Sequence, residues 1–143
     1  MSLLTITGTT NKNIIAYVER VYSFLGLDEL NAFVDVEFSR ACAGGAGGYC
    51  DGDEDEINIE IARTDNAGVI DMEQRLINIA HEMIHARQMA SGRLVNCGVV
   101  LKDNAMSTKQ IFDGVEYVGV SYKDQPWEKE AYDAEEEVMK RCL

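Results

Sequence analysis

The stretch DMEQRLINIAHEMIHARQMASG, residues 71–92, contains the strongest helix signals in the chain. Asp71 with Gln74 three residues later resembles a capping box, and Gly92 stands where a left-handed residue commonly ends a helix. These signals predict a helix over residues 72–90. At 100° per residue, apolar side chains fall on two sides of this helix, and this pattern is typical of a helix at the centre of a domain. The larger group is Met72, Leu76, Ile79, Ala80 and Met83, and the smaller group is Ile77 with Ile84.

The segment HEMIH, residues 81–85, contains both histidines of the chain. His81 and His85 are four residues apart, so they project from one face of the helix and can bind one tetrahedral zinc ion. Glu82 points to the side of that pair, where its carboxylate can take the proton of a zinc-bound water. The segment therefore predicts Zn²⁺ as the cofactor and Glu82 as a general base.

A catalytic zinc site usually combines three protein ligands with one open position, and the chain offers no third histidine. The richest carboxylate stretch on a predicted helix is WEKEAYDAEEE, residues 127–137. Pro126 and a helical apolar stripe predict a final helix over residues 126–141. On this helix Asp133 points well away from the apolar stripe. The periodicity leaves three glutamates as candidates for the third ligand: Glu128, Glu130 and Glu135.

Other side chains could complete such a site. Cys50 and Cys97 are alternative zinc ligands, but the four cysteines lack paired CxxC spacing and we expect reduced thiols. Tyr122 and Tyr132 lie near or on the final helix and are candidates for stabilising the oxyanion that forms when water attacks a carbonyl. Tyr49 is a weaker candidate for the same role.

The remaining elements are predicted by shorter patterns. An apolar stripe over residues 11–26 indicates a first helix, whereas FVDVEF (33–38) and INIEI (57–61) alternate like strands with one buried face. The segment 41–56 between them, which includes CAGGAGGYCDGDEDE, is rich in glycine and then acidic, and predicts a loop that could gate a site. Asp113-Gly114 is a strong hairpin signal.

These elements predict one α+β domain over residues 1–143. We expect a small antiparallel or mixed sheet packed on the central helix that carries HEMIH, with the first and last helices around it.

The amino-acid composition limits the kinds of partner that the protein can bind. The chain has 25 acidic and 13 basic residues and a formal net charge of −12, which argues against nucleic acid and anionic membranes as partners. The start, MSLLTITGTTNK, has no signal-peptide pattern, and no apolar stretch is long enough to cross a bilayer. We therefore expect a cytoplasmic protein whose peptide or protein substrate is neutral or basic.

HEMIH followed by a helix carrying PWEKEAYDAE (126–135) resembles the compact zinc metallopeptidases of the gluzincin type, including ImmA/IrrE-like and small phage-encoded or SprT-like domains. The resemblance implies a zincin-like fold. It also implies that Glu130, directly before an alanine, is the third zinc ligand, and that Asp133 or another acid orients a ligand histidine. By the same resemblance, INIEI would be the edge strand along which a substrate peptide lies antiparallel.

Three functions are compatible with these residues. The first is a metallopeptidase in which His81, His85 and Glu130 bind zinc and Glu82 activates water. The second is a zinc-binding assembly or interaction domain without turnover. The third is a zinc amidase that acts on cell-wall peptides.

Overall fold

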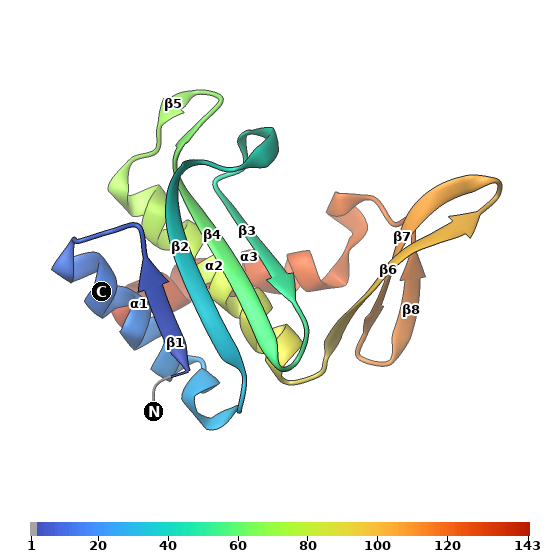
Figure 1. Cartoon of the computed structure of the whole chain (residues 1–143), viewed down its shortest axis with the longest axis horizontal. Coiled ribbons are helices and arrows are strands. Elements are labelled where there is room, and N and C mark those ends of the chain that lie inside the picture. Colours follow the sequence, from blue (N-terminus) through green and yellow to red (C-terminus); the bar gives the residue numbers. More distant parts are fainter. Residues whose placement is uncertain (1–2) are drawn as a thin grey trace.

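A mixed sheet forms one layer of the molecule (Figure 1). The structure is a computed structural model, and it describes residues 3–143. The strands of this sheet are β1 (Leu4–Thr7), β2 (Phe33–Ala41), β3 (Gly48–Gly52), β4 (Glu56–Asp65) and a short β5 (Gly68–Val69). In space they follow the order β1-β2-β4-β3, with β5 paired to the end of β4. β1, β2 and β4 are parallel, whereas β3 is antiparallel to β4 and forms the edge.

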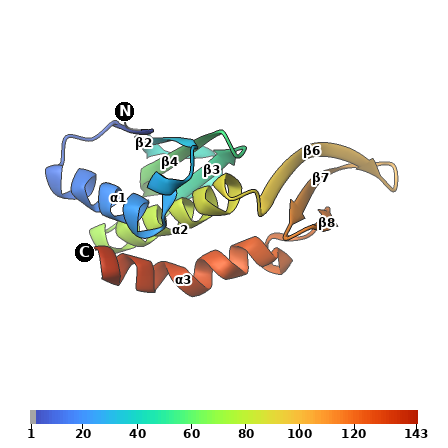
Figure 2. The same ribbon diagram turned by 90° about the horizontal axis from the view of Figure 1, so that it is seen from below.

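Three α-helices lie within residues 3–143: α1 (Lys12–Phe24), α2 (Met72–Ala90) and α3 (Pro126–Cys142). α1 and α2 cover one face of the sheet, and α3 lies on the side of α2 that faces away from the sheet (Figure 2). α2 is therefore enclosed between two layers. None of the three helices has the length and apolar character that crossing a bilayer requires.

A second, three-stranded antiparallel sheet projects from the end of α2 (Figures 1 and 2). It consists of β6 (Leu94–Lys102), β7 (Ala105–Phe112) and β8 (Val115–Val118), and we call residues 94–118 the arm. Both of its turns use left-handed residues, at Asp103-Asn104 and at Asp113-Gly114. Two consecutive residues with positive φ are typical of a tight type I′ hairpin, whose twist matches the twist of the strands.

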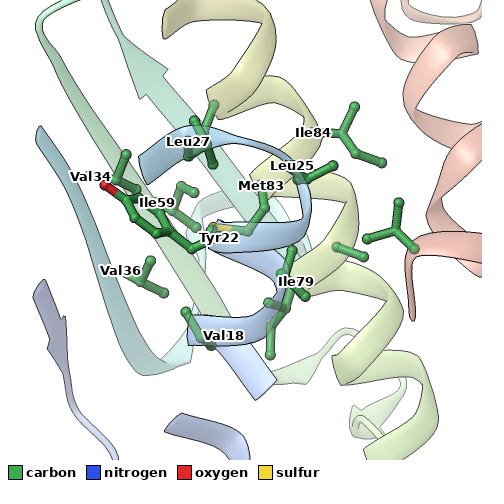
Figure 3. Packing of buried hydrophobic residues seen from close by; sticks show 14 of the residues in the cluster. Val18, Tyr22, Leu25, Leu27, Val34, Val36, Ile59, Ile79, Met83 and Ile84 are labelled. Atoms are coloured by element: carbon green, nitrogen blue, oxygen red, sulfur yellow. The ribbon is translucent and has the colours of Figure 1, made fainter. Parts of the chain in front are cut away.

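The hydrophobic core lies between the sheet and the first two helices (Figure 3). Alternate residues of β2 and β4 face α1 and α2, as the period of two in these strands requires. The fully buried members of this core include Val18, Val34, Val36, Ile57 and Ile79. The hydroxyl of Tyr17 also links the helices, because it donates a hydrogen bond to the carbonyl oxygen of Leu76 at 2.7 Å.

Most of the predicted elements are confirmed. The central helix covers residues 72–90, and the Asp71 side chain accepts a hydrogen bond from the backbone N–H of Gln74 at 2.9 Å. Gly92 follows the helix with a φ of 77°, as expected for a left-handed cap. The α+β class, the mixed sheet, the first and last helices and the hairpin at residues 113–114 are also present.

Two expectations about the edge of the sheet are wrong. Residues 48–52 form β3, although the segment 41–56 was expected to be a loop throughout. Because β3 pairs with one side of β4 and β2 pairs with the other, the INIEI segment lies inside the sheet rather than at its edge. The sequence patterns also missed β1, β5 and β6.

The core prediction can be tested at Ile79, which is fully buried on α2. We expect Ile79→Ala to lower the free energy of unfolding by about 2–5 kcal/mol, because it removes buried methylene groups and leaves a cavity. The exposed Val69 is the control, and Val69→Ala should change stability by no more than about 0.5 kcal/mol. Urea unfolding of both variants measures the difference, and equal values would contradict this packing.

Candidate metal centre

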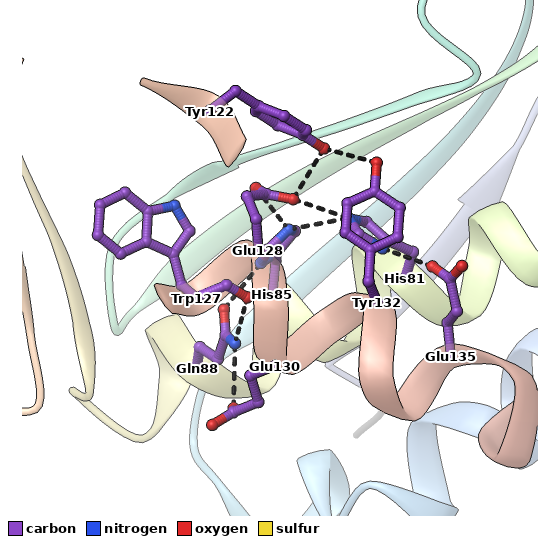
Figure 4. Close-up of polar contacts among 9 residues, drawn as sticks. All are labelled: His81, His85, Gln88, Tyr122, Trp127, Glu128, Glu130, Tyr132 and Glu135. Atoms are coloured by element: carbon purple, nitrogen blue, oxygen red, sulfur yellow. Dashed lines mark hydrogen bonds and ion pairs between the residues drawn. The ribbon is translucent and has the colours of Figure 1, made fainter. Parts of the chain in front are cut away.

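The two histidines of α2 converge on one point (Figure 4). Their four-residue spacing places the imidazoles one turn apart, and the Nε2 atoms of His81 and His85 are 3.2 Å apart. Both side chains are buried because α3 covers this side of α2. The buried face therefore carries two nitrogen atoms that point toward each other instead of toward solvent.

Glu128, in the first turn of α3, supplies a carboxylate to the same point. One oxygen lies 3.0 Å from Nε2 of His81, and the other lies 2.9 Å from Nε2 of His85. The ligand atoms of these three residues all lie within 4.8 Å of one another. Among residues 3–143 they form the one such group of three or more histidine, cysteine or acidic side chains.

This donor set fits a tetrahedral zinc ion. Two nitrogen ligands bound at about 2.0–2.1 Å with a tetrahedral angle are roughly 3.3 Å apart. The observed separation of 3.2 Å between the two Nε2 atoms is close to that value. Two imidazoles and one carboxylate are also a common protein ligand set of catalytic zinc, which leaves a fourth position for water.

The outer nitrogen of each histidine is held by a second partner. Nδ1 of His81 lies 2.7 Å from Glu135 Oε2, and Nδ1 of His85 lies 2.7 Å from Gln88 Oε1. The amide nitrogen of the fully buried Gln88 donates to two other acceptors, so its oxygen faces His85 and accepts a hydrogen bond from Nδ1–H. These contacts orient both rings and leave the Nε2 atoms to bind a cation.

The electrostatics of this cluster favour a bound cation. Burial acts to lower the pKa of His81, but the hydrogen bond with Glu128, the charge of Glu82 and the hydrogen bond with Glu135 together raise it to about 9. Burial acts to raise the pKa of Glu128, but hydrogen bonds with His81 and His85 lower it to about 2. Without a metal, the acidic surroundings therefore favour a proton on the histidines, and a metal ion would replace it.

Glu82 is buried next to the cluster but is not a member of the ligand group. Burial raises the pKa of its carboxyl group, and the neighbouring His85 and His81 act in the opposite direction. Its side chain packs under β3, where a Cβ atom on Gly48 would come within 2.9 Å of the Glu82 Cγ. Glycine at position 48 is what allows the edge strand to pass this close to the site.

The two predicted tyrosines also lie at the cluster (Figure 4). The hydroxyl of Tyr122, in a short 3-10 turn (Tyr122–Asp124), donates a hydrogen bond to Glu128 Oε1 at 2.9 Å and lies 3.0 Å from the Tyr132 hydroxyl. The Tyr132 ring packs against the ring of His81, with the centroids 4.6 Å apart. Burial and the contact with Tyr132 raise the pKa of Tyr122, so its hydroxyl stays protonated and can donate.

Glu130 is not placed with the histidines. Its carboxylate accepts hydrogen bonds from Arg93 at 2.9 and 2.7 Å and from Gln88 at 3.0 Å. Two residues along a helix correspond to a rotation of about 200°, so Glu128 and Glu130 point in different directions. Glu128 therefore occupies the position that the resemblance implied for Glu130, which instead supports His85 indirectly through Gln88.

The other predicted side chains have different positions. Asp133 is exposed, and Glu135 is the acid that orients a ligand histidine. Cys50 lines a cavity beside His85, whereas Cys97 is exposed on the arm. Tyr49 is also exposed.

Two residues of the site, Gln88 and Arg93, were not predicted. Gln88 stands three residues after His85 on the same helix, and this spacing was the signal that could have revealed it. Arg93 lies beyond the helix end, and nothing local in the sequence indicates its pairing with Glu130.

Two cavities flank the histidines. One, of about 280 Å³, is polar and is lined by residues that include Asn78, His81, Glu82 and Glu135. The other, of about 200 Å³, lies between β3 and the base of the arm, and it is lined by residues that include His85 and Trp127. Access to the cluster is therefore possible from both sides of the pair.

No protein-family model matches this chain, and the comparisons with curated proteins and with solved structures find no match either. The evidence for a function consequently comes from the geometry of the site.

The third ligand can be identified by metal content. We expect zinc-loaded wild type to retain about one ion per chain after dialysis, and Glu128→Ala to lose it because one of three ligands is missing. Glu130→Ala removes the same charge from the same helix but should retain the ion. Elemental mass spectrometry of the three proteins decides between the two glutamates, and loss only in Glu130→Ala would contradict the geometry.

Zinc uptake should also release protons. Because the pKa of His81 in the metal-free protein is raised to about 9, this group is largely protonated at pH 8 and must lose its proton to bind a metal. We expect calorimetry in buffers of different ionisation enthalpy to show release of about one proton from His81, with a further contribution from His85, whose pKa is also raised, against the effect of burial, by the hydrogen bond with Glu128, and we expect zinc affinity to rise with pH up to about 9. Glu135→Gln removes one cause of the raised pKa of His81, so this variant should release fewer protons than the wild type. Equal proton release by the two proteins would argue against the contribution of Glu135 to the pKa of His81.

Proposed function

We propose that this protein is a zinc-dependent metallopeptidase with a zincin-like arrangement of helix and edge strand. The observation that carries the proposal is the convergence of His81, His85 and Glu128 beside the buried carboxylate of Glu82. Two imidazoles, one carboxylate and a separate general base are the parts that metal-assisted hydrolysis needs.

The chemistry can be divided among these residues. Zinc held by the three ligands would lower the pKa of a bound water and polarise a carbonyl group. Glu82 would accept the proton of that water and then pass it to the leaving amine, and its raised pKa suits a group that must both take and return a proton. Tyr122 or Tyr132 would donate a hydrogen bond to the oxygen of the attacked carbonyl.

The position of β3 favours a peptide as substrate. β3 is the edge strand, so among the described residues one of its sides has no strand partner. It passes directly over Glu82 at Gly48 and borders both cavities that flank the histidines. An extended peptide added to this edge by backbone hydrogen bonds would place a carbonyl group next to the metal centre.

Charge limits the kind of peptide. Glu82, Glu128 and Glu135 surround the two histidines, and the whole chain has a formal net charge of −12. A strongly acidic peptide would be repelled, so we expect neutral or basic sequences around the cleaved bond.

The role of Glu82 separates a peptidase from a zinc-binding domain without turnover. We expect Glu82→Gln to retain zinc but to hydrolyse peptides about 10²–10⁴-fold more slowly, because the amide cannot accept a proton. Asp133→Asn, which removes an exposed carboxylate from α3, should leave the rate unchanged. The measurement is cleavage of a mixed peptide library by the zinc-loaded proteins, followed by mass spectrometry.

Zinc binding without cleavage of any peptide by the wild type would contradict the peptidase and support the non-catalytic alternative. Cleavage at an undiminished rate by Glu82→Gln would contradict the assigned mechanism.

A further inference from the structure

The arm carries exposed apolar side chains on the strand face that also lines the metal centre. Cross-strand pairing places Leu94 opposite Phe112, and Asn96 opposite Gln110. Leu94, Asn96 and Gln110 line the cavity beside His85. This end of the arm is anchored to the rest of the protein, because the rings of Phe112 and Tyr117 pack against Trp127.

The same face continues outward to the tip of the arm. Gln110, Thr108 and Met106 alternate along β7, so their side chains share one face. On β6, Val99 pairs with Thr108 and Leu101 pairs with Met106. A register shift between residues 96 and 99 keeps the side chains of Val99 and Leu101 on the same face as Asn96. The exposed fractions of these side chains are 58% for Val99, 70% for Leu101 and 72% for Met106. We call these three residues the apolar tip.

We propose that the apolar tip binds apolar side chains of an extended polypeptide substrate, on the N-terminal side of the cleaved bond. This inference rests on the proposed function. Its basis is the continuity of one strand face from the cavity beside His85, through Asn96 and Gln110, to the tip.

The direction of the substrate follows from β3. This strand begins at Gly48 above Glu82, and its later residues Cys50 and Asp51 line the cavity next to the arm. A peptide added antiparallel to β3 would therefore run from the arm toward Glu82, and its N-terminal part would lie at the arm. From Gln110 to Met106 the strand advances by four residues, roughly 13 Å, and the cavity between Gln110 and His85 adds about one or two residues more, so the contact falls about four to six substrate residues before the cleaved bond.

A peptide segment fits the apolar tip better than a second copy of the chain. A stable protein–protein interface involves about 20–30 residues on each side. The tip offers three apolar residues, next to the left-handed turn at Asp103-Asn104. That number suits two or three side chains of an extended peptide.

The test compares cleavage profiles of zinc-loaded proteins on a library of peptides derived from a whole proteome. The variant is Leu101→Thr/Met106→Thr, which removes apolar surface from exposed strand positions but keeps a residue that favours strands. The matched control is Val95→Thr, since Val95 is exposed on β6 and pairs with Ile111 on the opposite face.

We expect wild type and Val95→Thr to prefer apolar residues about four to six positions before the cleaved bond, and the double variant to lose this preference. On a peptide with those residues, kcat/KM of the double variant should fall about tenfold, mainly through KM. On the same peptide shortened so that it cannot reach the arm, the three proteins should be equal within about twofold.

Four results would overturn the inference. Cleavage without that preference in the wild type, or with the preference intact in the double variant, would reject the role of the tip while leaving the peptidase proposal standing. A wild-type dimer that the double variant converts to a monomer, measured by light scattering, would assign the tip to self-association. Absence of cleavage by the wild type would remove the proposed function itself and the inference with it.

Discussion

The burial of α2 on two sides is the constraint on which the site depends. The sheet covers its apolar side and the Glu82 side chain, and α3 covers the opposite side of the helix (Figure 2), where His81, His85 and Gln88 have their partners. Polar side chains that are removed from water must find partners, or the fold loses a few kcal/mol for each group. Among the described residues, no fully buried side-chain nitrogen or oxygen lacks a hydrogen-bond partner. Packing α3 on this face therefore required carboxylates at the right positions, and Glu128 and Glu135 supply them.

The same requirement connects the candidate metal centre to the arm. Gln88 contacts His85 on one side and Glu130 on the other, and Glu130 is bound by Arg93. Arg93 also binds Asp113 in the β7–β8 turn, at 2.8 and 3.0 Å. A continuous chain of hydrogen bonds thus runs from a candidate ligand to the base of the arm. The position of the arm relative to the histidines is fixed by polar contacts as well as by the packing of Phe112 on Trp127.

Much of the fold could be predicted from the sequence because its signals are local. The helix over residues 72–90 is marked by a cap at each end, and the pairing of His81 with His85 follows from helical spacing alone. The choice among the three glutamates of α3 could not be made in this way. It depends on how α3 is rotated against α2, and that rotation is set by contacts such as Arg93 with Glu130, which are distant in sequence.

The edge strand was missed for a related reason. Gly48, Cys50 and Gly52 face the helix side of β3, and glycines there suggest a loop when only the sequence is considered. In the structure the glycine at position 48 is required by the close approach of Glu82. A residue type that weakens the strand signal is thus the one that allows the strand to reach the site.

The central claim is that His81, His85 and Glu128 bind zinc. X-ray absorption spectroscopy at the zinc edge, on protein loaded with one equivalent of zinc, tests it most directly. The structure predicts nitrogen and oxygen ligands at about 2.0–2.2 Å, with the scattering pattern of two imidazoles and without sulfur. A sulfur ligand at about 2.3 Å would instead place Cys50 or another thiol on the metal, and failure to bind zinc at all would contradict the claim.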